Sequence, residues 1–155
     1  MLLATLLLAC AATKADSADP CLPGDEPTLA IGTGEYAYEP LPDDRRLELI
    51  HGPQGGYHVI ISLEATFIDA SSTTEAELSG TIDGVEMAHT LPYLTFRCDR
   101  VNDAQYAWGS LLIWDAQPED LHGREAVVSA TVRDAAGAEV SAESTIVIWD
   151  PALGD

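Results

Sequence analysis

The feature that most constrains the fold of this chain is an alternation of apolar and polar side chains that begins after Thr28 and runs almost to the end. A period of two is the spacing of a half-buried β-strand, because successive side chains of a strand point to opposite faces. The alternation is clearest over residues 57–67. We expect one face of this segment to lie in the core, and that face carries Tyr57, Val59, Ile61, Leu63, Ala65 and Phe67.

Two stretches predict β-hairpins. The first surrounds Asp83-Gly84, a two-residue turn of the kind that accepts positive φ and closes a hairpin with the correct twist. The second is the sequence EAVVSATVRDAAGAEVSAESTIVIW, in which two alternating runs flank a short polar loop. The main strands expected cover residues 57–67, 76–82, 85–87, 93–98, 106–114, 126–132 and 140–148.

No window combines the apolar stripe and the caps of a helix. Eight or nine strands separated by turns predict an all-β chain with two packed antiparallel sheets. The closing hairpin resembles the last two strands of bacterial immunoglobulin-like domains, over about the final third of the chain. This resemblance implies an immunoglobulin-like β-sandwich over residues 28–155. A small β-barrel or a jelly roll is the alternative.

The chain opens on MLLATLLLAC, an apolar run that ends at a cysteine. A membrane-spanning helix needs about 20 apolar residues, so this run is too short to span but suits an export signal. Leu7-Leu8-Ala9-Cys10 resembles the bacterial lipobox. The resemblance implies that residues 1–9 are a signal peptide and that Cys10 carries a lipid. The alternatives are an ordinary cysteine in a secretory signal, or a buried apolar strand.

Residues 10–27 contain three prolines and two acidic clusters, which is typical of a flexible tether between a lipid and a domain. Ala11 directly after Cys10 resembles the outer-membrane sorting signal of enteric bacteria. We therefore expect a lipoprotein of the bacterial cell envelope, held by its N-terminal lipid at the outer membrane.

The three cysteines leave one unpaired in an oxidising compartment. If Cys10 carries a lipid, Cys21 and Cys98 remain to form a disulfide across 77 residues. In the chain-entropy description such a bond contributes roughly 4 kcal/mol to stability. Two free buried thiols are the alternative.

Charge excludes one class of partner. The chain has 26 acidic and 7 basic residues, a formal net charge of −19, whereas nucleic-acid affinity depends on many lysines and arginines. Hydrophobic residues make up 46% of the chain, which is enough for a core. We expect no nucleic-acid partner.

Two features predict a binding surface. Residues 52–56 (GPQGG) hold more glycine and proline than a tight turn needs, which favours a recognition loop that includes Gln54, Tyr57 and His58. Tyr106, Trp108 and Trp114 share one parity of their strand, and an exposed aromatic row stacks on sugar rings or anchors a protein. Both faces of that strand are apolar, so core packing is the alternative. The expected partner is an envelope protein or a glycan.

Metal binding and catalysis have weaker signals. His51 and His58 flank the glycine loop, but Leu47, Leu49 and His51 share a face opposite to that of His58, so a shared metal needs a bulge. Loop carboxylates could bind calcium, although no twelve-residue calcium loop is present. Neither a GxSxG elbow nor a nucleotide-binding loop occurs.

The function expected is therefore a lipid-anchored binding or structural module, neither an enzyme nor a cofactor protein. The alternatives are a periplasmic lipoprotein that binds copper or calcium and, third, a carbohydrate-active enzyme.

Overall fold

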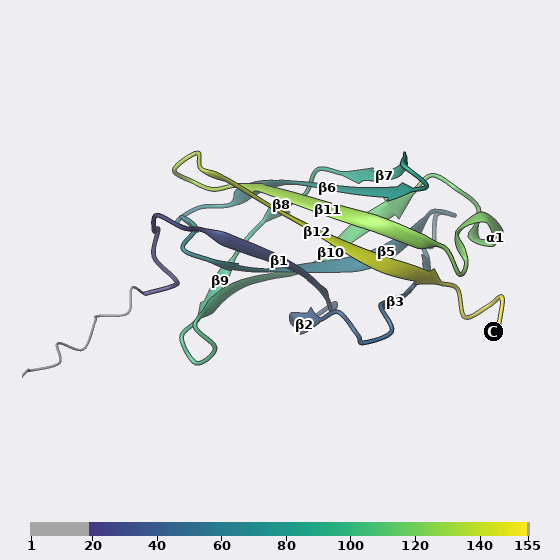
Figure 1. Cartoon of the computed structure of the whole chain (residues 1–155), viewed down its shortest axis with the longest axis horizontal. Helices are drawn as coiled ribbons and strands as arrows, with labels where there is room; N and C mark the ends of the chain where they lie inside the picture. The colour runs from purple at the N-terminus through teal and green to yellow at the C-terminus, as the bar shows by residue number, and fades with distance from the viewer. Residues whose placement is uncertain (1–18, 155) are drawn as a thin grey trace, which may run out of the picture.

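The structure is a computed structural model that describes residues 19–154, and over this range it is all-β (Figure 1). One helix of a single turn, α1 (Pro118–Leu121), interrupts the strands. No helix in the described range has the length and apolar character needed to cross a bilayer. The strands are β1 (Thr28–Thr33), β2 (Glu39–Pro40), β3 (Arg46–Glu48), β4 (Ile50–His51), β5 (Tyr57–Thr66), β6 (Thr74–Ile82), β7 (Val85–Thr90), β8 (Tyr93–Leu94), β9 (Arg97–Asp99), β10 (Ala104–Trp114), β11 (Glu125–Arg133) and β12 (Glu139–Trp149).

Both predicted hairpins are confirmed. Strands β6 and β7 meet at Asp83 and Gly84, whose φ angles of 51° and 78° are the positive values that the two-residue turn requires. Strands β11 and β12 pair without a register break from Glu125 opposite Val147 to Arg133 opposite Glu139. These local pairings therefore follow from turn chemistry and alternation alone.

The strands join into one mixed sheet rather than the two separate antiparallel sheets expected. The hydrogen-bonded order is β2-β1-β5-β10-β7-β6-β11-β12-β3. A single pair, Trp114 opposite Ala88, connects β10 to β7 and so links the two halves of the path. The expectation of antiparallel pairing is wrong for β3, which runs parallel to β12.

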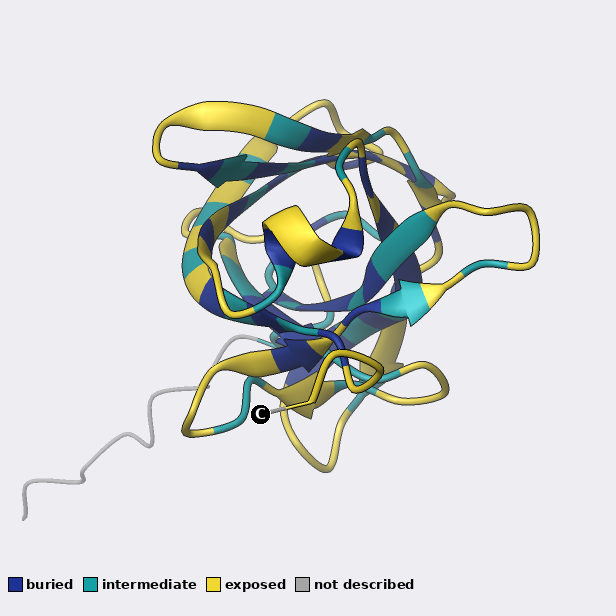
Figure 2. Ribbon diagram, turned by 90° about the vertical axis from the view of Figure 1, so that its right-hand side faces the viewer, coloured by how far each residue is buried: buried dark blue, intermediate teal, exposed yellow. Residues whose placement is uncertain are grey.

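Residues 46–51 bring the two ends of this path together. Strand β3 pairs with β12, and after Leu49 the chain continues as β4, which pairs with β5. The Leu49 N–H also donates to the Trp149 carbonyl at 2.7 Å. The strands consequently surround a common interior, and α1 lies across one end of it (Figure 2).

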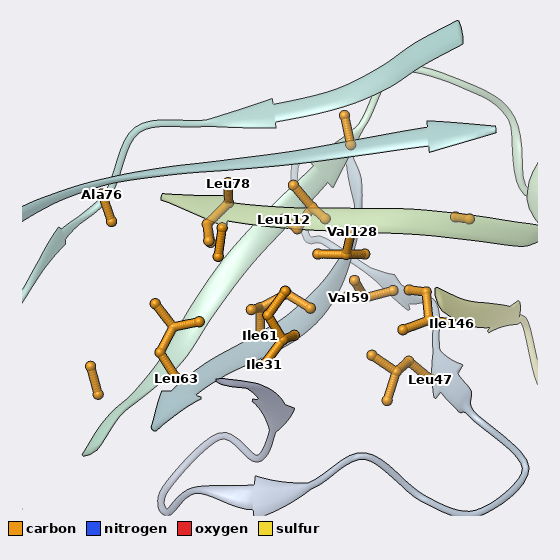
Figure 3. Close-up of a cluster of buried hydrophobic side chains, with 14 of the residues drawn as sticks. Ile31, Leu47, Val59, Ile61, Leu63, Ala76, Leu78, Leu112, Val128 and Ile146 are labelled. Atoms are coloured by element: carbon orange, nitrogen blue, oxygen red, sulfur yellow. The ribbon is translucent and has the colours of Figure 1, made fainter. Parts of the chain in front are cut away.

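The interior is filled by the inward faces of these strands (Figure 3). The predicted inward face of β5 is confirmed at four positions, while Tyr57 is only partly buried. Phe67 lies beyond the end of β5 with a φ of 60° and is also only partly buried. Burying one such aliphatic side chain contributes about 1.5–3 kcal/mol. Core residues include Ile31, Leu47, Leu49, Val59, Ile61, Leu63, Ala65, Leu78, Leu112, Val128, Ile146 and Ile148.

The disulfide Cys21–Cys98 is present, so the predicted pairing is confirmed. Pro20 accepts a 2.7 Å hydrogen bond from the Phe67 N–H, and Gly24 donates to the Phe67 carbonyl at 2.9 Å. Residues 10–27 were expected to form a flexible tether, but the end of this segment is attached to the domain. The domain therefore begins before Thr28. The predicted lipid site Cys10 and signal peptide 1–9 lie outside the described residues.

Candidate functional site

A β-bulge in β10 decides where its aromatic side chains point. The pairing of β10 with β5 shifts register between Ala107 and Ser110, and Gly109 within the bulge has a φ of +77°. The extra residue reverses the side-chain parity of the rest of the strand. Tyr106 and Trp108 are therefore half-buried on the outer face, whereas Trp114 points inward and is only 3% exposed.

This bulge corrects the expectation of one aromatic row. Trp114 packs in the core, where its ring lies so close to Gly80 that a Cβ there would come within 2.6 Å of it. It is therefore not available as a surface binding residue. The signal for the bulge was in the sequence, because an isolated glycine inside a strand pattern often marks one.

Tyr106 and Trp108 line a surface groove of about 880 Å³ together with Tyr38, which directly precedes β2. The rings of Tyr38 and Tyr106 stack with their centroids 5.0 Å apart and their planes inclined by 26°. The Arg97 guanidinium, at the start of β9, lies 5.2 Å from the centroid of the Trp108 ring. We name this site the aromatic groove.

Polar groups complete the aromatic groove. Glu64 comes from β5 and Asp99 from the end of β9, while Arg100 and Asn102 come from the turn between β9 and β10. The Asp99 carboxylate accepts hydrogen bonds from the Val101 N–H at 2.8 Å, the Asn102 N–H at 3.2 Å and the Asn102 side-chain amide at 2.8 Å. These bonds lower the pKa of Asp99, and the bond from the Val101 N–H contributes most. They also fix the shape of the turn.

The two tyrosine hydroxyls stay neutral at physiological pH. Burial raises the pKa of both Tyr38 and Tyr106, and the nearby Glu64 carboxylate raises each further. A neutral phenol can both donate and accept a hydrogen bond. The aromatic groove therefore offers ring surfaces, carboxylates, an amide, two guanidinium groups and hydroxyls within one hollow.

The glycine loop lies away from this groove. Tyr57, where β5 begins after the loop, is opposite Trp114, whereas Tyr106 is opposite Glu64 near the other end of the β5–β10 pair. Eight residues of strand separate the two points on β10, or about 26 Å. The structure therefore does not bring the loop residues Gln54, Tyr57 and His58 together with Trp108.

The loop is closed by its own backbone. The Gly52 N–H donates to the Gly56 carbonyl at 2.7 Å, and the Gly55 N–H donates to the Gly52 carbonyl at 3.0 Å. Gly55 has a φ of +84°, which is why a glycine is needed there. Gln54 is exposed, while Tyr57 and His58 are partly buried.

The histidines of this loop do not face one another across the hairpin. His51 pairs with Tyr57, and His58 pairs with Ile50. The His51 Nε2 atom lies 2.8 Å from the carboxylate of Asp150, and its ring meets the edge of the Tyr57 ring. Over residues 19–154 no group of three histidine, cysteine, aspartate or glutamate side chains is placed to hold a metal ion.

Several residues of the groove were not expected from the sequence, among them Tyr38, Glu64, Arg97, Asp99, Arg100 and Asn102. They lie on segments far apart in the chain, and only pairing in the sheet and the disulfide next to Arg97 bring them to Trp108. Fold and site together define a disulfide-bonded all-β domain with an aromatic surface groove. No known family model matches the chain, and no curated protein matches it either.

Proposed function

We propose that this protein is a binding module of the bacterial cell envelope, anchored by a lipid on Cys10, and that its aromatic groove binds a glycan chain. The observation that carries this proposal is the groove itself, in which three aromatic rings lie beside polar side chains. Sugar rings present apolar C–H faces that pack on aromatic rings, and their hydroxyls need donors and acceptors at the edge. Tyr38, Tyr106 and Trp108 supply the aromatic rings, and Glu64 and Asn102 supply the hydrogen-bonding groups.

The strand order supports an immunoglobulin-like arrangement for the module. Strands β1-β5-β10-β9 follow one another as strands A, B, E and D do in immunoglobulin domains, and β7-β6-β11-β12 follow the order C′, C, F and G. Such domains commonly act as recognition modules. A fold alone does not determine what a domain binds, so the proposed function rests on the residues of the groove.

The start of the described chain supports the link between anchor and groove. Asp19 pairs with the groove residue Arg100 at 2.9 Å, and Cys21 is bonded to Cys98 in the groove wall. Nine residues of chain, from Cys10 to Asp19, reach at most about 30 Å. A lipid on Cys10 would hold the groove within that distance of the membrane surface.

Calorimetry with soluble peptidoglycan oligosaccharides tests the proposed ligand class. We expect the wild-type domain to bind them and Trp108→Ala to weaken binding at least tenfold. Trp149→Ala is the matched control, because Trp149 also lies against an arginine, Arg46, but outside the groove. Equal binding by the two variants, or no binding by the wild type, would contradict the proposal.

Mass spectrometry of the protein purified from bacterial membranes tests the anchor. We expect the wild type to begin at Cys10 with the mass of acyl chains added, and Cys10→Ser to be released from the membrane fraction. An unmodified Cys10, or a membrane-bound Cys10→Ser variant, would contradict lipidation while leaving glycan binding to stand on the calorimetry.

A further inference from the structure

Strand β10 has an open edge between its two short neighbours. On one side it pairs with β5 along nearly its whole length. On the other side it pairs with β9 only at Ala104–Tyr106 and with β7 only at Trp114. Within the described part of the chain, no strand pairs with residues 107–113 on that side. We name this gap the β10 seam.

The backbone of β10 presents hydrogen-bonding groups to this seam. The Asp115 N–H donates to the Met87 carbonyl of β7 at 2.8 Å, and the Ile113 N–H lies 3.4 Å from the Thr90 hydroxyl. Backbone groups of a strand alternate between its two sides. The N–H and the carbonyl of Leu111 therefore face the same side as those of Ile113 and Asp115.

The seam is hollow, and several large apolar side chains line it. A groove of about 530 Å³ runs along it, lined by Tyr93, Leu94, Leu111 and Ile113 among others. Tyr93 is 73% exposed, Ile113 50% and Leu111 41%. A strand edge without a neighbouring strand, beside a groove partly lined by exposed apolar side chains, is the arrangement into which an extended peptide adds as a further strand.

Direction and charge define the occupant. Both β7 and β9 run antiparallel to β10, so a segment that fills the gap between them would run antiparallel too. Its N-terminal end then lies near Ile113, beside a hollow that Glu86, His89 and Asp115 line, and its C-terminal end meets Arg97. Glu86 lies 3.4 Å from His89, and within residues 19–154 the Asp115 carboxylate has no hydrogen-bond or ion-pair partner, so carboxylates predominate at the N-terminal end. A basic N-terminal end and an acidic C-terminal end complement these charges.

We propose that the β10 seam binds an extended peptide segment of a partner protein as an added antiparallel strand, with apolar side chains at alternate positions, a basic residue at its N-terminal end and an acidic one at its C-terminal end. A second copy of this chain fits less well, because each copy carries a net charge of −19. The seam is separate from the aromatic groove, although Trp108 and Arg97 border both.

Fluorescence anisotropy with the labelled hexapeptide Lys-Val-Thr-Val-Thr-Glu tests this proposal. We expect saturable binding to the wild-type protein and at least tenfold weaker binding of the charge-reversed peptide Glu-Val-Thr-Val-Thr-Lys. Leu111→Lys should weaken binding of the first peptide at least tenfold. Val127→Lys is the matched control, since Val127 is 40% exposed on β11 and the substitution adds the same charge there.

Backbone pairing gives a second, independent measurement. N-methylation of the peptide at alternate positions should abolish binding in one register and leave it nearly unchanged in the other, because only one set of N–H groups faces β10. Hydrogen exchange at the Leu111 amide should slow when peptide binds. Tyr38→Ala, at a residue that lines the aromatic groove but not the seam, should weaken glycan binding and leave the response to the two methylated peptides unchanged, so the two proposals fail separately.

Three results would overturn the proposal: no peptide binding at millimolar concentration, equal effects of Leu111→Lys and Val127→Lys, or equal effects of methylation in the two registers. A dimer of the wild-type protein in light scattering, abolished by Leu111→Lys, would also overturn it, because the seam would then be covered by a second copy.

Discussion

At the scale of single residues, Gly109 determines which side chains reach the aromatic groove. Its φ of +77° belongs to the left-handed region, and a Cβ there would lie 2.7 Å from the Glu35 carbonyl oxygen. Its N–H also lies 3.2 Å from both the Gly34 carbonyl and the Ser62 hydroxyl. The bulge is thus held on both sides, and no other residue type fits without movement.

Gly109→Ala should therefore destabilise the domain more than Gly137→Ala does. Gly137 also has a positive φ, +87°, but open space surrounds its Cβ position. The left-handed conformation costs about 1–2 kcal/mol in each variant, and only Gly109→Ala adds the clash with backbone. Urea unfolding of both variants measures the difference. Equal losses of stability would show that the bulge relaxes freely.

Asp150 predicts an acid-sensitive contribution to stability. Its side chain is 1% exposed. Burial by itself raises its pKa, but hydrogen bonds from His51 and from the Ala152 N–H outweigh this, so the pKa lies below its usual value. A carboxylate with a lowered folded-state pKa contributes stability above its unfolded pKa, about 3.9, and loses it as pH falls through the folded value.

Asp150→Asn should consequently be less stable than the wild type at pH 7 and should lose less of its remaining stability below about pH 4. Asparagine keeps an acceptor for the Ala152 N–H but cannot titrate. Urea midpoints of both proteins from pH 7 to pH 2.5 provide the measurement, with Asp43→Asn on the exposed surface as the control. Parallel curves for Asp150→Asn and the wild type would contradict this account.

At the scale of elements, the sequence predicted those strand pairings that neighbouring residues determine. The Asp83-Gly84 turn and the long β11–β12 hairpin follow from neighbouring residues, and both were predictable. The parallel pairing of β3 with β12 joins residues about 100 positions apart, and alternation alone does not choose between such partners. For the same reason, the sequence did not predict that Tyr38 and Arg97 belong to the aromatic groove.

The disulfide joins two elements that no strand pairing connects. Cys21 precedes β1, while Cys98 lies in β9, and the bond closes a separation of 77 residues. Cys21→Ala/Cys98→Ala should lower stability by roughly 4 kcal/mol, because the unfolded chain regains the entropy that the bond removes. Thermal unfolding with and without reductant gives the measurement. An unchanged melting temperature in reductant would contradict it.

The same double cysteine variant also shows whether glycan binding depends on the disulfide while the fold is kept. The Gln105 side chain still donates to the Pro20 and Ile68 carbonyls, at 3.2 and 3.1 Å, so the start of the domain keeps a second attachment. We expect the reduced domain to remain folded at low temperature but to bind glycan more weakly, because Cys98 lies in the wall of the aromatic groove.

At the scale of the whole molecule, the large negative charge opposes folding. The chain carries a net charge of −19, and most arginines of the described part lie in ion pairs at the surface, such as Arg46 with Asp44 and Arg133 with Glu139. Exposed pairs contribute at most about 1 kcal/mol each. We therefore expect repulsion among the carboxylates to outweigh these ion pairs.

Salt should accordingly stabilise this protein. Raising NaCl from 0.02 M to 0.5 M shortens the screening length from about 20 Å to about 4 Å, which weakens long-range repulsion more than the short ion pairs. We expect the melting temperature to rise over this range. Glu48→Gln/Glu125→Gln, at two exposed positions, should raise the melting temperature in low salt and reduce its increase with NaCl. A melting temperature that falls as NaCl is added would contradict this account, because it would mean that the ion pairs outweigh the repulsion.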